Sequence, residues 1–196
     1  MLYLRNTNQI QSLSQQVNRG PAGEPPPTPP VTGSYFNGLG RQAYLGLIDP
    51  FANPNGYATG SVTGSIVVDS GSLVPVFGSD GPPEQYVSNQ WLGYFKASTT
   101  ETYSFFLFND DNAMLWIGNA ATASVLTTGS ALLKSPTATP TTGSISLTSG
   151  SYYPIRIQYA DARGAAYFTS SFSTPTITKT TDYTNYTFCN TASLGF

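Results

Sequence analysis

Short segments in which apolar and polar residues alternate run through the chain after residue 32, and they constrain the fold more than any other feature. Residues 102–108 (TYSFFLF) are the strongest, and residues 153–159 and 166–172 alternate in the same way. The segments end at Gly, Ser, Thr, Asn or Asp, which favour turns. This spacing predicts an antiparallel all-β sandwich or barrel. Further strands are expected at 61–68, 86–95, 113–117 and 144–147.

Composition supports a folded domain and argues against most enzyme classes. Only 9% of the 196 residues are charged, compared with about 25% in an average soluble domain. Because 13% are aromatic, this low charge does not indicate disorder. The chain has no histidine, which removes the commonest general base and every catalytic triad that needs one. No convincing acid/base pair replaces it, so we expect a protein that is not an enzyme.

Charge and hydropathy limit the partners and the location. The net charge is −2 and no basic run occurs, so no nucleic-acid partner is expected. No segment approaches the roughly 20 apolar residues of a membrane span. Met1–Ile10 lacks the apolar region of a signal peptide although the composition is that of an exterior protein. A virion protein, a mature chain or non-classical export would explain this mismatch, and we expect a virion or extracellular surface location.

Three parts are expected along the chain. Residues 1–31 read as an extended arm, because Pro25–Pro30 (PPPTPP) favours a stiff polyproline II spacer. Residues 32–177 form the predicted sandwich, and residues 178–196 form a C-terminal tail or last strand. The single cysteine, Cys189, cannot form an internal disulfide and is either a buried or tail thiol or an intermolecular bridge.

An acidic bend is the most distinctive local feature. Asp110 and Asp111 lie between Tyr103–Phe108 and Ala113–Ile117, which we expect to pair across the bend. Adjacent carboxylates with nearby Asn and backbone carbonyl groups are the ligand set of a Ca²⁺ site. An ordinary turn, in which Asp and Asn bond nearby backbone N–H groups, is the alternative. The candidate ligand-binding residues that flank the carboxylates are Asn109 and Asn112.

Four motifs in register resemble the PA14 domain family over about residues 32–175. The central ones are Trp-x-Gly-Tyr at 91–94 and the run from Tyr103 through the Asp pair to Ile117. Gly33–Gly38 is similar to the opening strand, Leu147–Tyr159 to a later strand, and Ala165–Pro175 to the closing strand. The resemblance implies a PA14-like β-sandwich of the kind found in adhesins, glycosidases, toxins and surface proteins.

The resemblance also implies a site. In the yeast-adhesin lectin branch the adjacent Asp pair is joined by a cis peptide and binds Ca²⁺, which coordinates sugar hydroxyls. The matching residues are Asp110 and Asp111. That branch also uses an Asn from a late loop, where the nearest candidate here is Asp161, and its disulfides are missing from this chain. Trp91 and Trp116 are expected to be core residues, with a sugar-stacking platform as the alternative.

Two functions remain. The first is a structural component of a large assembly, most simply a viral minor capsid protein, whose arm contacts other copies or other shell proteins. The alternative is a calcium-dependent, glycan-binding adhesin. The two are compatible, because a capsid protein could display a glycan-binding face.

Overall fold

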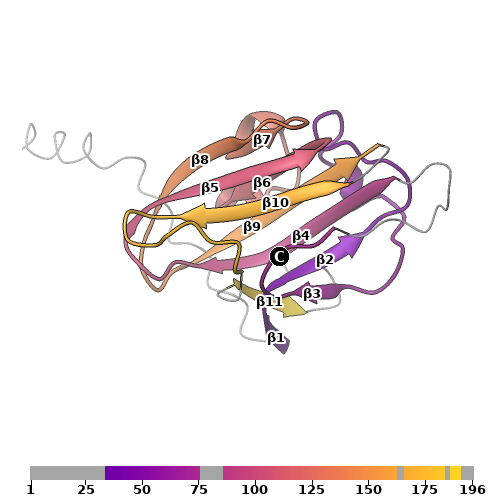
Figure 1. Ribbon diagram of the computed structural model, residues 1–196. Helices are drawn as coiled ribbons and strands as arrows, with labels where there is room; N and C mark the ends of the chain where they lie inside the picture. Colours follow the sequence, from indigo (N-terminus) through magenta and orange to yellow (C-terminus); the bar gives the residue numbers. More distant parts are fainter. Residues whose placement is uncertain (1–33, 76–85, 163–165, 184–185, 191–196) are drawn as a thin grey trace, which may run out of the picture.

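The computed structural model describes residues 34–75, 86–162, 166–183 and 186–190, which form a two-layer antiparallel β-sandwich (Figure 1). The larger sheet has the order β1-β11-β4-β9-β6-β7, with β2 paired to β4 and β3 paired to β2, and the smaller sheet has the order β10-β5-β8. The predicted all-β sandwich is confirmed. The strands are β1 (Ser34–Asn37), β2 (Leu39–Ala43), β3 (Val67–Asp69), β4 (Val87–Lys96), β5 (Glu101–Asp110), β6 (Asn112–Ile117), β7 (Leu133–Ser135), β8 (Thr141–Leu147), β9 (Tyr152–Asp161), β10 (Tyr167–Ser173) and β11 (Tyr186–Asn190).

Helical structure is limited to short pieces within the described ranges. These are the 3₁₀ helices η1 (Gly56–Ala58) and η2 (Thr128–Ser130) and the α-helix α2 (Asn119–Thr122). No helix in this part of the chain is long and apolar enough to cross a membrane. The predicted arm, residues 1–31, lies outside the described residues. β11 comes from the segment predicted as a tail or last strand, and it pairs with β1 and β4.

β5 shows why the alternating segments become strands. Successive side chains of a strand point to opposite faces, so every second residue can enter the core. Tyr103, Phe105 and Leu107 are at most 1% exposed, while the residues between them lie half-buried on the other face. The rings of Tyr103 and Phe105 meet Phe95, from β4 of the facing sheet, edge-on, and they pack at a tilt against Phe172, from the neighbouring strand β10. The core therefore fills the space between the two sheets and is strongly aromatic.

The outer face of the larger sheet is covered by the loop that follows β2. The Tyr57 hydroxyl donates hydrogen bonds to the carbonyls of Ile48 (2.8 Å) and Tyr159 (2.9 Å). The Gln158 side chain donates to the carbonyl of Pro54 at 2.9 Å. Because this loop covers the second face, β4 and most of β9 are buried on both sides.

The prediction of a strand at 61–68 is largely wrong, because most of this segment belongs to the loop that covers the larger sheet. Only its end enters β3, while its first residues belong to the covering loop. There Leu45 N donates to the Ser61 carbonyl at 2.7 Å, and Thr63 N donates to the Ala43 carbonyl at 3.0 Å. The tertiary role of the loop overrides the local alternation.

The predicted pairing of β5 with β6 is also wrong. β5 pairs with β10 and β8, whereas β6 lies between β9 and β7 in the other sheet. The burial patterns give the reason. β5 has one buried face, but nearly every residue of β6 is buried, as in a strand inside a covered sheet. The acidic bend therefore carries the chain from one layer of the sandwich to the other.

Gly38, between β1 and β2, is expected to tolerate no side chain. Its φ is +124°, and a Cβ atom there would lie 2.3 Å from the Asp69 carbonyl oxygen. Gly71 also has a positive φ, +89°, but a Cβ there meets nothing within 4 Å. Gly71→Ala should therefore cost about 1 kcal/mol for its backbone conformation. Gly38→Ala should cost about 2 kcal/mol more, because backbone atoms must move apart. Urea unfolding of both variants measures the difference, and equal costs would contradict the close approach.

Candidate functional site

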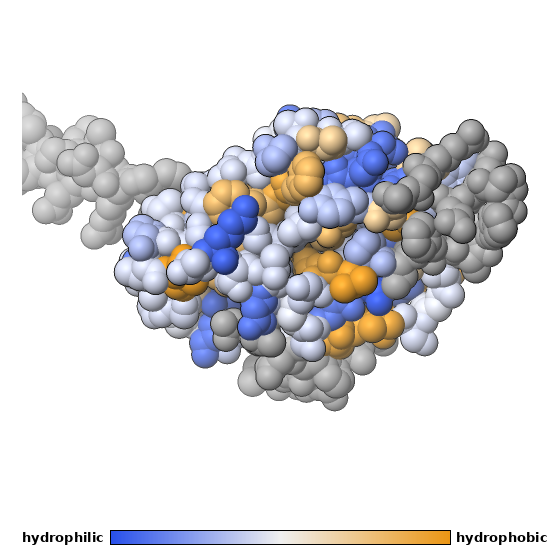
Figure 2. Space-filling model, in the orientation of Figure 1, coloured by the Kyte–Doolittle hydropathy of each residue, from blue (hydrophilic) through white to orange (hydrophobic). Residues whose placement is uncertain are grey.

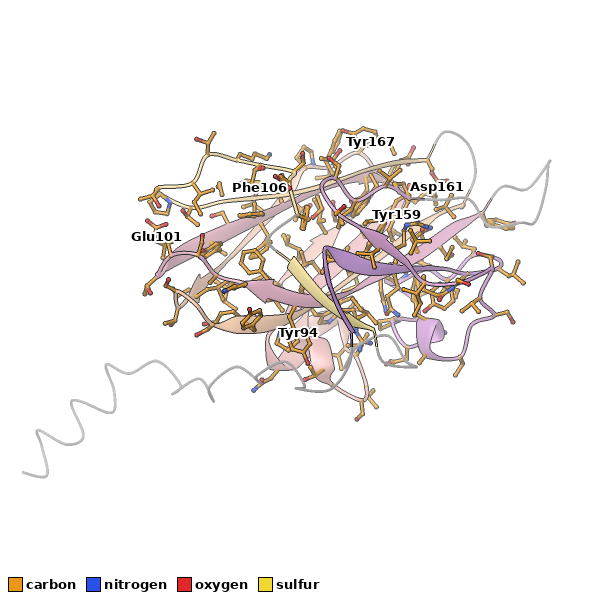
Figure 3. The ribbon with its side chains drawn as sticks, turned by 90° about the horizontal axis from the view of Figure 1, so that it is seen from below. Tyr94, Glu101, Phe106, Tyr159, Asp161 and Tyr167 are labelled. Carbon is orange, nitrogen blue, oxygen red and sulfur yellow. The ribbon has the colours of Figure 1, made fainter. Side chains whose placement is uncertain are left out.

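The acidic bend lies at one end of the sandwich, where β5 ends and β6 begins. The peptide bond between Asp110 and Asp111 is cis. Both side chains are partly exposed. In Figure 3 the labelled Tyr159 and Asp161, from the end of β9, lie together, while Glu101, at the start of β5, lies at the opposite end of the molecule.

Hydrogen bonds from two directions hold the Asp111 carboxylate. Its Oδ2 accepts from the backbone N–H of Ala162 at 2.9 Å, and its Oδ1 accepts from the Thr137 hydroxyl at 3.0 Å. The Asp111 N–H donates to the carbonyl of Ala160 at 3.1 Å. The end of β9 and the loop after β7 therefore fix the orientation of this side chain.

The surroundings of Asp110 disfavour the charged form of its carboxyl group. Partial burial, followed by the hydrogen bond with and the repulsion from Asp111, raises the pKa of the Asp110 carboxyl. Its carbonyl oxygen accepts a hydrogen bond from the Tyr159 hydroxyl. Burial, and then the negative charges of Asp161 and Asp110, raise the pKa of Tyr159, which keeps the phenol protonated as a donor.

Asp161 lies at the end of β9 and is 1% exposed. Its Oδ2 is 3.5 Å from the Tyr159 hydroxyl, so this one phenol lies against both Asp161 and the carbonyl of Asp110. The structure therefore brings Asp161 close to the bend. Among the described residues, however, no three His, Cys, Asp or Glu side chains are grouped in a way that could hold a metal ion by themselves.

The two asparagines of the bend differ in position. Asn109 is fully buried, and its side-chain amide donates to the carbonyls of Asp111 and Ser135, both at 3.0 Å. Its Oδ1 accepts no hydrogen bond from the part of the chain that the structure describes. Asn112 is partly exposed and donates from Nδ2 to Asp49 Oδ1 at 3.1 Å. Of the two, Asn112 faces the surface pocket at the bend.

A pocket of about 190 Å³ opens beside the bend and collects residues from four separate parts of the sequence. The sequence did not indicate Asp49, Thr137 or the exposed Leu47, because they lie far from the acidic pair along the chain. A turn signal, Asp49-Pro50, was visible, but nothing in it placed the turn beside β6. The lining residues are Leu47, Asp49, Asp111, Asn112, Thr137, Ala160 and Ala162.

The oxygen-rich composition of this site fits a hard cation. Ca²⁺ takes six to eight oxygen ligands from carboxylates, amides, carbonyls and water. Asp110 and Asp111 supply carboxylates, and Asn112 and Thr137 supply neutral oxygen atoms nearby. The buried Oδ1 of Asn109 is a further acceptor without a hydrogen-bond donor among the described residues. A cation would also relieve the repulsion within the Asp pair.

Both tryptophans lie in the core and not at the site. Trp91 and Trp116 are each 0% exposed. Trp91 stacks on Phe168, with ring centroids 4.9 Å apart, and Trp116 donates from its indole to the carbonyl of Thr127. The expectation of core residues is confirmed, and neither ring is accessible for stacking on a sugar.

The fold and the bend together define the class of this protein, a PA14-like β-sandwich. Its central part, residues 87–174, matches the model of the GLEYA domain. The match begins with β4 and ends just after β10, so it includes Asp110, Asp111 and Asp161. The comparison with curated proteins found no match.

Solved structures agree with this class. The A domain of epithelial adhesin 6 from Candida glabrata, in complex with Galb1-3GlcNAc, is similar with a TM-score of 0.64, 15% identity and coverage of 83% of this chain and 91% of that chain. The A domain of epithelial adhesin 9 from Candida glabrata, in complex with Galb1-4GlcNAc, has a TM-score of 0.62 and 18% identity, and the match covers 86% of this chain and 95% of that chain. A PA14 sugar-binding domain from an RTX adhesin has a TM-score of 0.54 and 15% identity, and the match covers 77% of this chain and 97% of that chain.

These findings bear on the expectations from the sequence through the fold. The predicted resemblance to the PA14 family is confirmed at the level of the fold. The similar structures include adhesin domains in complex with glycans. The viral capsid role, the shell-protein partners and the virion location therefore find no support in these comparisons.

Proposed function

We propose that this protein is a non-enzymatic, calcium-dependent glycan-binding domain that acts in adhesion at an extracellular surface. The observation that carries the proposal is the Asp110–Asp111 bend, whose carboxylates meet at the partly exposed end of the sandwich beside a pocket. The adhesin domains with the same fold, which were solved with bound disaccharides, support it.

Each residue of the bend has a role in this proposal. Asp110 and Asp111 bind the cation, and Asp161 is the predicted third acidic residue of the site. A bound Ca²⁺ supplies positive charge and coordination positions that sugar hydroxyls can fill. Thr137 and the Ala162 N–H keep the Asp111 carboxylate in one orientation, which lowers the cost of ordering it on binding.

The pocket beside the bend suits a saccharide. Asn112, Thr137 and Asp49 offer hydrogen-bonding groups, while Leu47 adds an apolar side chain that is 44% exposed. Ligand sites combine such apolar surface with a few fixed polar groups. The neutral hydroxyl and amide groups would distinguish one sugar epimer from another.

The direct test uses the complete chain. Calcium at one hundred times its dissociation constant should stabilise the fold by about 2.7 kcal/mol and raise the melting temperature by about 5–10 °C. A glycan array probed with the labelled protein should show signals in calcium that vanish in EDTA. Magnesium at the same concentration is the control, because it demands a smaller octahedral site. A melting temperature unaffected by calcium together with an empty array would refute the proposal.

A further inference from the structure

Tyr167 differs from the other aromatic residues in its exposure. Across residues 38–75, 86–162 and 166–183, it is the one exposed aromatic side chain, with 46% of its surface accessible. An aromatic ring that is exposed to water, where the others are buried or half-buried, is a candidate contact for a ligand. Since both tryptophans are buried, any stacking surface in these ranges has to come from elsewhere.

The position of Tyr167 places it at the acidic bend. It is the first residue of β10, and its cross-strand partner in β5 is Asp110. Directly opposite residues of an antiparallel pair project to the same face, with Cβ atoms about 5 Å apart. The ring of Tyr167 therefore lies beside Asp110 on the outer face of the smaller sheet. In Figure 3 it lies at the outer edge of the molecule, well away from Glu101.

Two neighbours hold the ring in place. The ring of Phe108 meets it nearly perpendicularly, with centroids 4.9 Å apart and planes at 72°. The Thr169 hydroxyl donates a hydrogen bond to the Tyr167 hydroxyl at 3.2 Å. An aromatic side chain that is already fixed loses little conformational entropy on binding a ligand.

The surrounding surface carries few charges, although Lys179 lies over the ring of Phe106 on the same face, 4.1 Å from its centroid. Outward-facing positions of β5 and β8 carry Ser and Thr, which form cross-strand hydroxyl pairs such as Ser104 with Ser144 at 3.0 Å. Figure 2, in which this side of the molecule faces the viewer, shows separate apolar patches and separate strongly hydrophilic patches on a surface that is otherwise of intermediate hydropathy. Such a surface suits a neutral, hydroxyl-rich ligand better than an apolar helix or an ion.

We propose that Tyr167, supported by Phe108 and Thr169, is an aromatic subsite that stacks on a sugar ring next to the one held at the Asp110–Asp111 bend. This subsite rests on the proposed glycan-binding function and extends it. It favours oligosaccharides over monosaccharides, because the ring offers a contact to a second sugar in addition to the one at the bend. The apolar C–H face of a pyranose packs on the tyrosine, and the hydroxyls stay in water.

The test compares the affinity of full-length variants for a monosaccharide and for the tightest-binding oligosaccharide found on the array. Tyr167→Ala should weaken oligosaccharide binding about tenfold or more, as loss of a well-placed aromatic contact does. It should leave monosaccharide affinity and the calcium-induced rise in melting temperature unchanged. Tyr167→Phe, which keeps the ring, should retain most of the affinity. Tyr152→Ala is the matched control. Tyr152 begins β9, at the opposite end of that strand from Asp161, so its loss should have no effect on binding.

The outcomes separate this inference from the function on which it rests. Unchanged oligosaccharide affinity in Tyr167→Ala overturns the subsite while the glycan-binding function stands. Equal losses for monosaccharide and oligosaccharide, or loss of the calcium response, also overturn it, because the change would then act through the bend. If the wild-type protein binds no glycan, both the function and the subsite are wrong.

Discussion

Replacing Asp110 with asparagine should abolish the calcium response and reduce glycan binding by more than 100-fold. The variant keeps the size of the side chain but removes one of the two carboxylates that the cation needs. Without calcium the same change should not destabilise the fold. The raised pKa of Asp110 shows that its charged form is disfavoured in the folded protein, so removing the charge relieves repulsion from Asp111.

Because Asp110→Asn should remove the stabilisation by calcium but should not lower stability without calcium, the result is easily distinguished from misfolding. The melting temperature in EDTA should equal or slightly exceed that of the wild type, whereas the temperature in calcium should no longer rise. Differential scanning calorimetry under both conditions measures the two quantities, and isothermal titration gives the glycan affinity. Asp182→Asn is the control, because Asp182 is exposed and lines a different pocket with Lys96 and Ser98. A full calcium response in Asp110→Asn would contradict the assigned role.

Truncating Trp91 should remove about 3–5 kcal/mol of stability, the largest effect on folding that we expect. The indole is completely buried at the centre of β4 and stacks on Phe168 across the sandwich. Its Nε1 donates to Asp69 Oδ2 at 2.7 Å, an atom that also accepts from Arg41 at 2.8 Å. Trp91→Ala leaves a large cavity and removes one donor from a largely buried carboxylate.

Denaturant unfolding of two further variants divides this effect into its parts. Trp91→Phe keeps a ring against Phe168 but loses the hydrogen bond to Asp69. The lost hydrogen bond should lower stability by about 1–2 kcal/mol, in addition to the small cost of exchanging one apolar ring for another. Val125→Ala, at a side chain 67% exposed, should change stability by less than about 0.5 kcal/mol. Trp116 remains as the fluorescent reporter in all three variants. A Trp91→Ala cost below about 1 kcal/mol would show that the indole is not a core residue.

The site shows where prediction from the sequence ended. Asp110, Asp111 and Asp161 could be proposed from the sequence because adjacent carboxylates and a motif in register are local features. Asp49, Thr137 and Tyr167 could not be identified, because their relevance depends on pairing across distant strands. Tyr167 became a candidate only when its register opposite Asp110 and its exposure were both known.

The sequence by itself determined the fold class and most strand positions, because a period of two residues encodes one buried face and needs no distant partner to be recognised. β5, β8, β9 and β10 lie close to their predicted ranges for that reason. Only the tertiary structure decided which strands pair. β5 and β6 are adjacent along the chain, but β5 buries one face whereas β6 is buried on both faces and lies in the other sheet. Sheet assignment depends on what covers each face, and the covering segments lie far away in the sequence.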